Sequence, residues 1–187
     1  MQDGRNYFVI TGGPGAGKTS IVERLAARGF PTVAEAGRDI LRQQVAIGGT
    51  AVHWADAAAY RDLMLQRGMD DYERMQGETD GPVFFDRGVT ELVGYCRLIG
   101  VAVPDHVRRA AALYRYNTTV FLAPPWPEIY ANDDLRKQDA DEAMRSSQLA
   151  SEVYAEFGYD VVEVPRAPVA DRAAFVLARA DAAMTGG

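Results

Sequence analysis

A strand, a glycine-rich loop and a helix follow one another near the start of the chain, and this order constrains the fold more than any other feature. Residues 7–11 (YFVIT) form a short apolar run without helical spacing, which predicts a buried parallel strand. Apolar residues recur at helical spacing across residues 18–28, and Gly29 suits the left-handed position at which helices end. The loop between them, residues 12–19 (GGPGAGKT), satisfies the pattern GxxxxGK(S/T) in full. We therefore expect a phosphate-binding loop (P-loop) here.

The residues of this loop are those needed to hold the phosphates of a nucleoside triphosphate. Glycine lets backbone N–H groups turn toward phosphate oxygens, and the following helix adds free N–H groups and the positive end of its dipole. Lys18 is expected to contact the β- and γ-phosphates, and the Thr19 hydroxyl to ligate Mg²⁺. We therefore expect ATP, or another nucleoside triphosphate, and Mg²⁺ as cofactors. The predicted nucleotide-binding residues of the loop are Gly13, Pro14, Gly15, Ala16, Gly17, Lys18, Thr19 and Ser20.

Strand-like and helix-like patterns alternate along the rest of the chain. Further strands are expected at residues 31–34, 83–86, 118–123 and 159–164, with helical patterns between them. This alternation predicts an α/β fold in which helices cover both faces of a parallel sheet. A length of 187 residues is typical of one domain, so residues 1–187 are expected to form a single three-layer unit with five strands.

Composition and charge narrow the possible partners and the compartment. The formal net charge of -6 argues against a broad electrostatic footprint on nucleic acid. Cys96 is the one cysteine, which excludes an internal disulfide and a thiolate-rich zinc site and suits a reducing compartment. The short polar start is unlike a secretory signal, and no apolar run approaches the roughly 20 residues that span a bilayer. We expect a cytoplasmic monomer or homodimer that acts on a small molecule, without nucleic-acid or membrane partners.

The strand at residues 83–86 (VFFD) ends on a carboxylate, Asp86. A P-loop requires such a carboxylate on a neighbouring strand to hold Mg²⁺, so Asp86 is the candidate; alternatively it caps a turn. Arg87 follows, where many P-loop ATPases that do mechanical work place a glutamate. A cation at this point favours phosphoryl transfer to a bound acceptor over rapid hydrolysis. Glu91 is close enough in the sequence to face the same site.

Glu35 stands where the second strand is expected to end. In open α/β sheets ligands bind beyond the carboxyl ends of the strands, so Glu35 is expected to share an edge of the sheet with the P-loop. It is our candidate for positioning an acceptor hydroxyl and taking its proton, with Arg38 orienting it or gripping the acceptor. The alternative is a carboxylate that stabilises a helix N-terminus and pairs with an arginine on the next turn.

Residues 128–145 are dense in charge of both signs and follow the fourth strand. A segment in this place can act as a lid whose arginines neutralise the transferred phosphoryl group and exclude water. Arg136 is the first candidate for this role and Arg145 the second. The alternative is a solvated mixed-charge helix end.

Four segments together resemble a known family: GGPGAGKTS, VAEAGR, FFDRG and the DDLR…R region. The chain is similar to small bacterial P-loop proteins predicted to be ATPases or kinases, and most of all to the ribosylnicotinamide kinase domain of bacterial NAD-salvage proteins. The similarity covers roughly residues 8–165. It departs at Gly88, where that kinase family generally carries an acidic residue, so the identity of the acceptor is not inherited.

The resemblance implies a nucleoside-kinase-like P-loop fold with a lid and with strand order 2-3-1-4-5. It also implies ATP as donor and a small acceptor that carries a hydroxyl group. By analogy with that fold, the adenine is expected near residues 165–168, after the fifth strand, which makes Arg166 a further candidate for nucleotide binding.

These patterns together predict a kinase that transfers the γ-phosphate of Mg-ATP to a hydroxyl of a small-molecule acceptor, nucleoside-like or another metabolite. The predicted metal ligands are Thr19 and Asp86. Three residues are expected to meet the acceptor, namely Glu35, Arg38 and Arg87. The predicted catalytic residues are Lys18, Glu35, Asp86, Arg87 and Arg136.

Two alternatives remain open at this point. One is a P-loop ATPase or nucleotide-dependent switch that regulates a protein partner. The other is a kinase of nucleic-acid ends, which the net charge disfavours and which a basic groove leading to Glu35 would revive.

Overall fold

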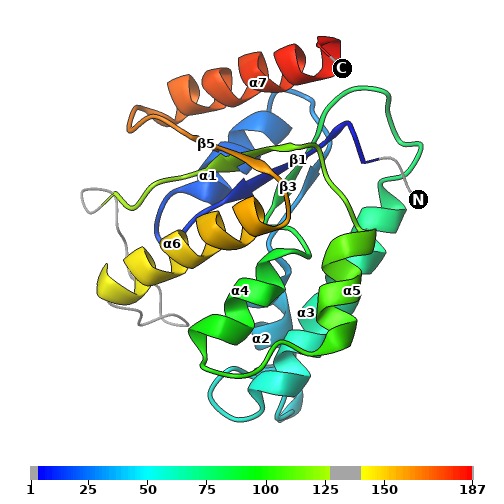
Figure 1. The fold of residues 1–187 in the computed structure, drawn as a ribbon, viewed down its shortest axis with the longest axis vertical. Helices are drawn as coiled ribbons and strands as arrows, with labels where there is room; N and C mark the ends of the chain where they lie inside the picture. The colour runs from blue at the N-terminus through cyan, green and yellow to red at the C-terminus, as the bar shows by residue number, and fades with distance from the viewer. Residues whose placement is uncertain (1–3, 127–139, 187) are drawn as a thin grey trace.

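The computed structural model describes residues 4–126 and 140–186, and within them strands alternate with helices (Figure 1). The strands are β1 (Tyr7–Thr11), β2 (Thr32–Val33), β3 (Val83–Asp86), β4 (Thr119–Leu122) and β5 (Asp160–Glu163). The helices are α1 (Lys18–Ala26), α2 (Ala36–Ile47), α3 (Ala57–Arg74), α4 (Glu91–Leu98), α5 (Asp105–Leu113), α6 (Ala140–Glu156) and α7 (Val169–Thr185). Each strand expected from the sequence is present, shorter by up to two residues.

The five strands form one parallel sheet in the order β2-β3-β1-β4-β5, which confirms the expected topology. The register pairs Ile10 of β1 with Asp86 of β3. Because the strands are parallel, their carboxyl ends meet at one edge of the sheet, so the loop that leaves β1 lies beside the end of β3. This register carries the expected metal carboxylate to the P-loop.

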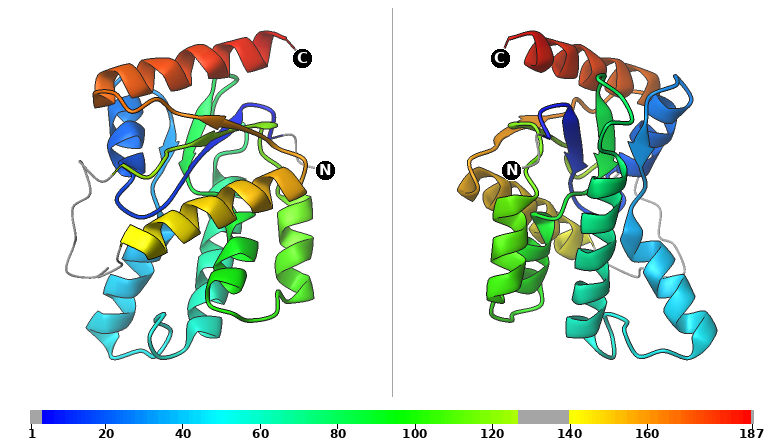
Figure 2. Two further views of the ribbon diagram at one scale, coloured as in Figure 1. Left: turned by 60° about the vertical axis from the view of Figure 1, so that its left-hand side comes forward. Right: turned by 90° about the vertical axis from the view of Figure 1, so that its right-hand side faces the viewer.

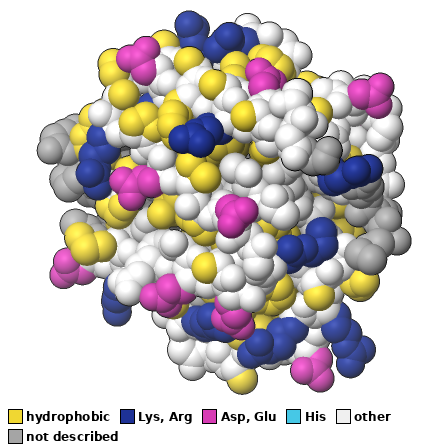
Figure 3. Space-filling model, turned by 45° about the horizontal axis from the view of Figure 1, so that its top comes forward, with side chains coloured by type: hydrophobic (Ala, Val, Ile, Leu, Met, Phe, Trp, Pro, Cys, Tyr) yellow, Lys and Arg dark blue, Asp and Glu magenta, His cyan; other side chains and the backbone are white. Residues whose placement is uncertain are grey.

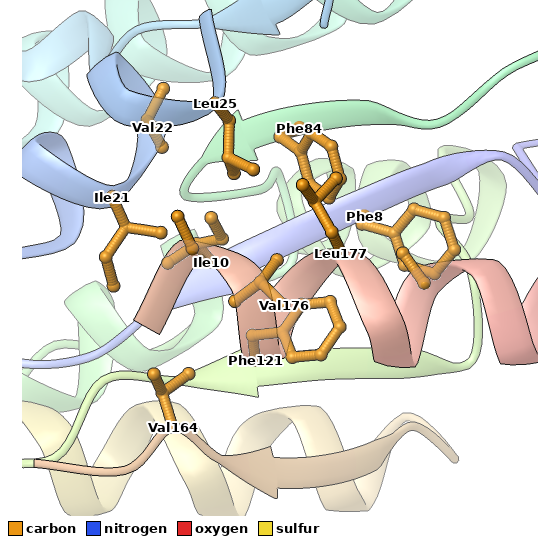
Figure 4. Packing of buried hydrophobic residues seen from close by; sticks show 12 residues of the cluster. Phe8, Ile10, Ile21, Val22, Leu25, Phe84, Phe121, Val164, Val176 and Leu177 are labelled. Carbon is orange, nitrogen blue, oxygen red and sulfur yellow. The ribbon is translucent and has the colours of Figure 1, made fainter. Parts of the chain in front are cut away.

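One face of the sheet is packed by α1 and α7 through mainly aliphatic and phenylalanine side chains. Phe8, Phe84 and Phe121 lie on neighbouring strands and are fully buried beneath α7 (Figure 4). Burying a side chain of this size stabilises the fold by about 1.5–3 kcal/mol. The helix side chains that complete this cluster are Ile21, Val22, Leu25, Ala173, Val176, Leu177 and Ala180.

The opposite face has a different composition, rich in tyrosine. Tyr72 of α3 packs edge-on against Tyr7, Tyr114 and Tyr116, and its hydroxyl donates to the carbonyl oxygen of Arg115 at 2.5 Å. Tyr154 of α6 is also fully buried here. Figure 2 shows α6 and the α3–α5 group on the side of the sheet away from α7, so helices cover both faces of the sheet. The three layers predicted from the sequence are confirmed.

The surface carries charges of both signs. On the face drawn in Figure 3, basic and acidic side chains are interspersed among apolar and uncharged ones. Within the described part of the chain, no helix combines the length and the apolar character needed to cross a membrane.

Candidate functional site

The P-loop closes tightly between β4 and α6, which explains its first two glycines. A Cβ at Gly12 would lie 2.2 Å from the carbonyl oxygen of Ala123, and a Cβ at Gly13 would lie 2.3 Å from that of Ala143. Such distances exclude a side chain at either position. The positive φ values of the loop, 136°, 72° and 77°, belong to Gly12, Gly15 and Gly17.

Lys18 is buried and folds back over the loop. Its Nζ donates to the carbonyl oxygens of Gly12 at 3.0 Å and Gly13 at 2.8 Å. Burial, together with the nearby charge of Arg87, lowers the pKa of Lys18 to about 8, although Asp86 acts in the opposite direction. A bound phosphate would favour the charged form, as an opposite charge within a few ångströms does.

Thr19 and Asp86 meet as the metal hypothesis requires. The Thr19 hydroxyl donates to Asp86 Oδ2 at 2.8 Å, while the buried Asp86 Oδ1 has no hydrogen-bond partner among the described residues. Burial raises the pKa of Asp86, opposed by the charge of Lys18. A hydroxyl and an unpartnered carboxylate oxygen are the hard ligands that Mg²⁺ prefers. The described residues contain no cluster of three or more metal-ligating side chains.

Arg87 lies between two carboxylates that come from different helices. Its Nε donates to Glu35 Oε1 at 3.2 Å, and its Nη1 pairs with Glu91 of α4. Glu91 also accepts from the backbone N–H of Gly88 at 3.3 Å and from the hydroxyl of Tyr154 at 3.4 Å. Burial acts to lower the pKa of Arg87, but the two carboxylates outweigh it and raise the pKa, so the guanidinium stays charged.

The backbone at Arg87 is in the left-handed region, with φ of 75°, and Arg87 is the one non-glycine residue of the described chain with a positive φ. Residues other than glycine adopt this conformation at a cost of about 1–2 kcal/mol. It occurs here directly after Asp86, the residue at which β3 ends. Such strain concentrates at functional sites.

Glu35 occupies the N-cap position of α2, yet its side chain makes no capping hydrogen bond with that helix. Its carboxylate is nearly buried, with 11% of the side chain exposed, and contacts Arg87, while Arg38 Nε lies 3.9 Å from its second oxygen. The alternative of a carboxylate at a helix N-terminus, paired with an arginine on the next turn, accounts for its N-cap position and for the contact with Arg38, but not for the shorter contact with Arg87.

A cavity of about 80 Å³ lies beside this group. Several carboxylates line the cavity, among them Glu35, Asp71 and Glu91. Arg87 also lines it and carries a positive charge. Apolar side chains from the sheet and from α3 and α4 complete the lining.

The remaining sequence candidates lie apart from this group or outside the described residues. Arg145 is exposed on α6, and Arg166 is exposed, with its Nε donating to the carbonyl oxygen of Pro125 at 3.3 Å. Arg136 lies outside the described residues, as does most of the expected lid; residues 140–145 begin α6. The structure thus brings together Lys18, Thr19, Glu35, Asp86 and Arg87.

Two residues of the site were not foreseen. Asp71 of α3 reaches the cavity wall, although its helix pattern gave no sign of it. Arg172 of α7 is 2% exposed and its Nη2 donates to the carbonyl oxygen of Ala16 in the P-loop at 2.9 Å. It lies four residues before Val176 on the buried side of α7. A charged residue on an otherwise apolar helix face is a signal that the sequence does contain.

Comparison with known proteins supports the fold and the nucleotide site. Over 77 residues, 40% of the chain, the sequence is 40% identical to the tRNA modification GTPase MnmE of Pseudomonas savastanoi pv. phaseolicola, and the match spans 17% of that protein.

Solved structures match nearly the whole chain at low identity. The NadR protein in complex with NR has a TM-score of 0.68 and 22% identity, covering 98% of this chain and 52% of that one. Deoxyadenosine kinase from M. mycoides has a TM-score of 0.65 and 12% identity over 94% of this chain and 99% of that one. Thymidylate kinase from Ehrlichia chaffeensis has a TM-score of 0.62 and 14% identity over 96% and 100%.

These likenesses confirm the nucleoside-kinase-like P-loop fold and the resemblance to bacterial NAD-salvage proteins. A family model described as an AAA domain matches residues 7–172, most of the chain. The chain therefore belongs to this AAA domain family.

Proposed function

We propose that the chain transfers the γ-phosphate of Mg-ATP to a hydroxyl group of a small molecule bound in the cavity beside Glu35. One observation carries this proposal. The carboxylate of Glu35 lines the cavity and is linked by Arg87 to the end of the strand that bears Asp86. A hydrolase needs only a site for water there, whereas the chain provides a lined cavity and a carboxylate at its rim.

The donor side is formed by the P-loop, Lys18, Thr19 and Asp86. Lys18 binds the phosphates, while Thr19 and Asp86 hold the metal ion. When bound, Mg²⁺ would neutralise negative charge on the β- and γ-phosphates. Arg87 places a permanent positive charge beside the phosphoryl group in transfer. Arg136, outside the described residues, remains a candidate for the same task from a lid.

On the acceptor side, Glu35 orients the hydroxyl for in-line attack on the γ-phosphorus. The O–P bond to the acceptor forms as the bond to the β,γ-bridging oxygen breaks, ADP leaves with that electron pair, and the hydroxyl proton passes to Glu35. Its contacts with Arg87 hold the carboxylate in place. Arg38 lies on the outer side of this pair and supports its orientation.

The arginines around the cavity favour an acceptor without a phosphate of its own. Arg67 and Arg74 are both paired with Asp71, at 3.1 Å and 2.8 Å, and Arg87 is paired with Glu35 and Glu91. A phosphate on the acceptor would compete with these carboxylates for the guanidinium groups and would be repelled by the negative charges of Glu35, Asp71 and Glu91 in the cavity lining. A nucleoside or another uncharged alcohol meets no such cost.

A second candidate is a slow nucleoside triphosphatase or switch that acts on a protein partner. The sequence match to a GTPase favours it. In that case Glu35 and Arg87 would position water, and the cavity would have no acceptor.

The decisive experiment is a screen of nucleosides, nucleoside monophosphates and other alcohols with ATP labelled at the γ-phosphate. We expect an uncharged alcohol to gain one phosphate. Glu35→Gln should lower kcat by about 100-fold or more, the usual contribution of a general base, with little change in the KM for ATP. Asp39→Asn is the matched control, because Asp39 pairs with Arg42 on the same helix and is 39% exposed.

Equal turnover in Glu35→Gln and wild type would remove Glu35 from the mechanism. Steady ATP hydrolysis that a macromolecule stimulates, without a phosphorylated acceptor in the screen, would instead support the switch.

A further inference from the structure

A buried arginine behind the P-loop is not used by the proposed reaction. Arg172, in the first turn of α7, is 2% exposed and bonds the carbonyl oxygen of Ala16 at 2.9 Å. Its guanidinium also lies 5.7 Å from the centre of the Trp126 ring. Its Nε is buried without a hydrogen-bond partner among the described residues.

The charge of Arg172 lacks a counter-ion within the described part of the chain, where it forms no salt bridge. Burying an ion without a partner costs several kcal/mol, and arginine does not escape this by losing its proton. Burial lowers the pKa of Arg172, and a guanidinium group keeps its proton in proteins. A carbonyl oxygen and an aromatic ring offset only part of the cost. If the residue only had to hold the P-loop in place, a neutral hydrogen-bond donor would suffice.

The bond to Ala16 also fixes the direction of a neighbouring N–H group. A trans peptide is planar, so its C=O and N–H point in opposite directions. The peptide that joins Ala16 to Gly17 therefore directs the Gly17 N–H away from Arg172 when its carbonyl is held by the guanidinium. In a loop of this pattern, N–H groups at these positions bind phosphate oxygens. A cation on the carbonyl further polarises the same peptide and strengthens its N–H as a donor.

We propose that Arg172 is a positioning residue for triphosphate binding: it holds the Ala16–Gly17 peptide with its N–H toward the phosphates, and the bound phosphates compensate its buried charge. The proposal concerns the donor side alone. It therefore stands or falls independently of the acceptor and of the kinase reaction.

The test uses Mg²⁺ with ADP and, separately, with inorganic tripolyphosphate, which presents phosphates without a base. Arg172→Met is expected to weaken both by the same factor, about 10-fold or more, as the loss of one charged hydrogen bond implies. Arg172→Lys, which keeps a charged donor, should recover most of that loss. Arg179→Met is the matched control, because Arg179 lies on the same helix and stacks on Phe175 at 5.5 Å. It should bind both ligands like wild type.

Thermal unfolding separates this role from a purely structural one. A structural contact lowers the Tm of the free and the ligand-bound protein alike, whereas Arg172→Met should mainly reduce the rise in Tm that tripolyphosphate produces. If Arg172→Met does not fold, Arg172→Gln takes its place, because the amide retains a donor and removes the charge. Wild-type affinity for tripolyphosphate in the folded neutral variant would overturn the proposal. So would a loss confined to ADP, which would place Arg172 at the base.

Discussion

Two arginines flank the P-loop, Arg172 buried and Arg87 half-buried, and their charges are balanced in different ways. Arg87, on the acceptor side, is paired with Glu35 and Glu91 from two helices. Arg172, on the donor side, has a carbonyl oxygen and an aromatic ring but no carboxylate among the described residues. In the free protein the charge of Arg87 is therefore balanced by carboxylates, whereas we propose that the charge of Arg172 is balanced by the anion that the P-loop binds.

The two faces of the sheet, on which these arginines lie, also differ in the side chains that pack them. The α1–α7 face of the sheet is packed by aliphatic and phenylalanine side chains, in which a single cation is conspicuous. The face covered by α3–α6 combines buried tyrosines with ion pairs, and the Tyr154 hydroxyl donates to the ion-paired Glu91. A preorganised network of charges orients a reacting group, whereas an uncompensated charge contributes affinity for a ligand of the opposite sign.

The largest expected effect concerns stability. Arg87→Met leaves the carboxylates of Glu35 and Glu91 nearly buried without their cation, and loss of one partner of such a pair destabilises by about 3–5 kcal/mol. Arg172→Met leaves no buried carboxylate unpaired among the described residues, but it leaves the Ala16 carbonyl oxygen without its donor, so its cost should be smaller, about 1–3 kcal/mol. Urea unfolding of the two variants without nucleotide measures the difference.

Arg97→Met calibrates this series, because the pair of Arg97 with Glu156 at 2.7 Å lies near the surface and should contribute about 1 kcal/mol or less. Equal losses in Arg87→Met and Arg172→Met would contradict the comparison.

The next effect is a pH dependence that originates in Lys18, on which the charge of Arg87 acts. Its pKa is about 8 in the folded chain, against an ordinary value of 10.5. Between these values the unfolded state binds more protons, so the contribution of Lys18 to the free energy of unfolding rises with pH in this window. The charged form binds phosphate, so tripolyphosphate affinity should fall by up to about tenfold per pH unit above 8.

Isothermal titration of tripolyphosphate across this pH range tests the assignment to Lys18. In Lys18→Met, affinity should be weak throughout and should lose this dependence. The same slope in the variant would assign the titration to another group.

The smallest effect belongs to the outer part of the acceptor network. Tyr154 donates to Glu91 over a long hydrogen bond of 3.4 Å, so Tyr154→Phe should destabilise the protein by about 1 kcal/mol or less. Phosphate transfer should change by less than about threefold, because Arg87 and the Gly88 N–H still hold Glu91. A loss as large as that of Arg87→Met would show that the tyrosine, rather than the arginine, fixes this carboxylate.

Local sequence patterns were enough to predict the residues of the donor side. The other contacts of the site join residues far apart in the sequence, and local patterns could not predict them. The P-loop, the strands and their order followed from contiguous motifs, from alternation and from the family resemblance. Glu35 and Arg87 were each identified, but their ion pair joins residues 52 positions apart and depends on the pairing of β2 with β3. The contact of Arg172 with Ala16 joins residues 156 positions apart, which no local pattern encodes.

The left-handed backbone at Arg87 costs conformational free energy, whereas the ion pairs of its side chain stabilise the fold. On conformational grounds alone, glycine is the favoured residue at this position, since it adopts a positive φ without strain. The ion pairs of the Arg87 side chain with Glu35 and Glu91 outweigh this strain. Arg87→Gly should therefore destabilise the protein less than Arg87→Met, by about the 1–2 kcal/mol of strain that glycine relieves, and should still be less stable than wild type.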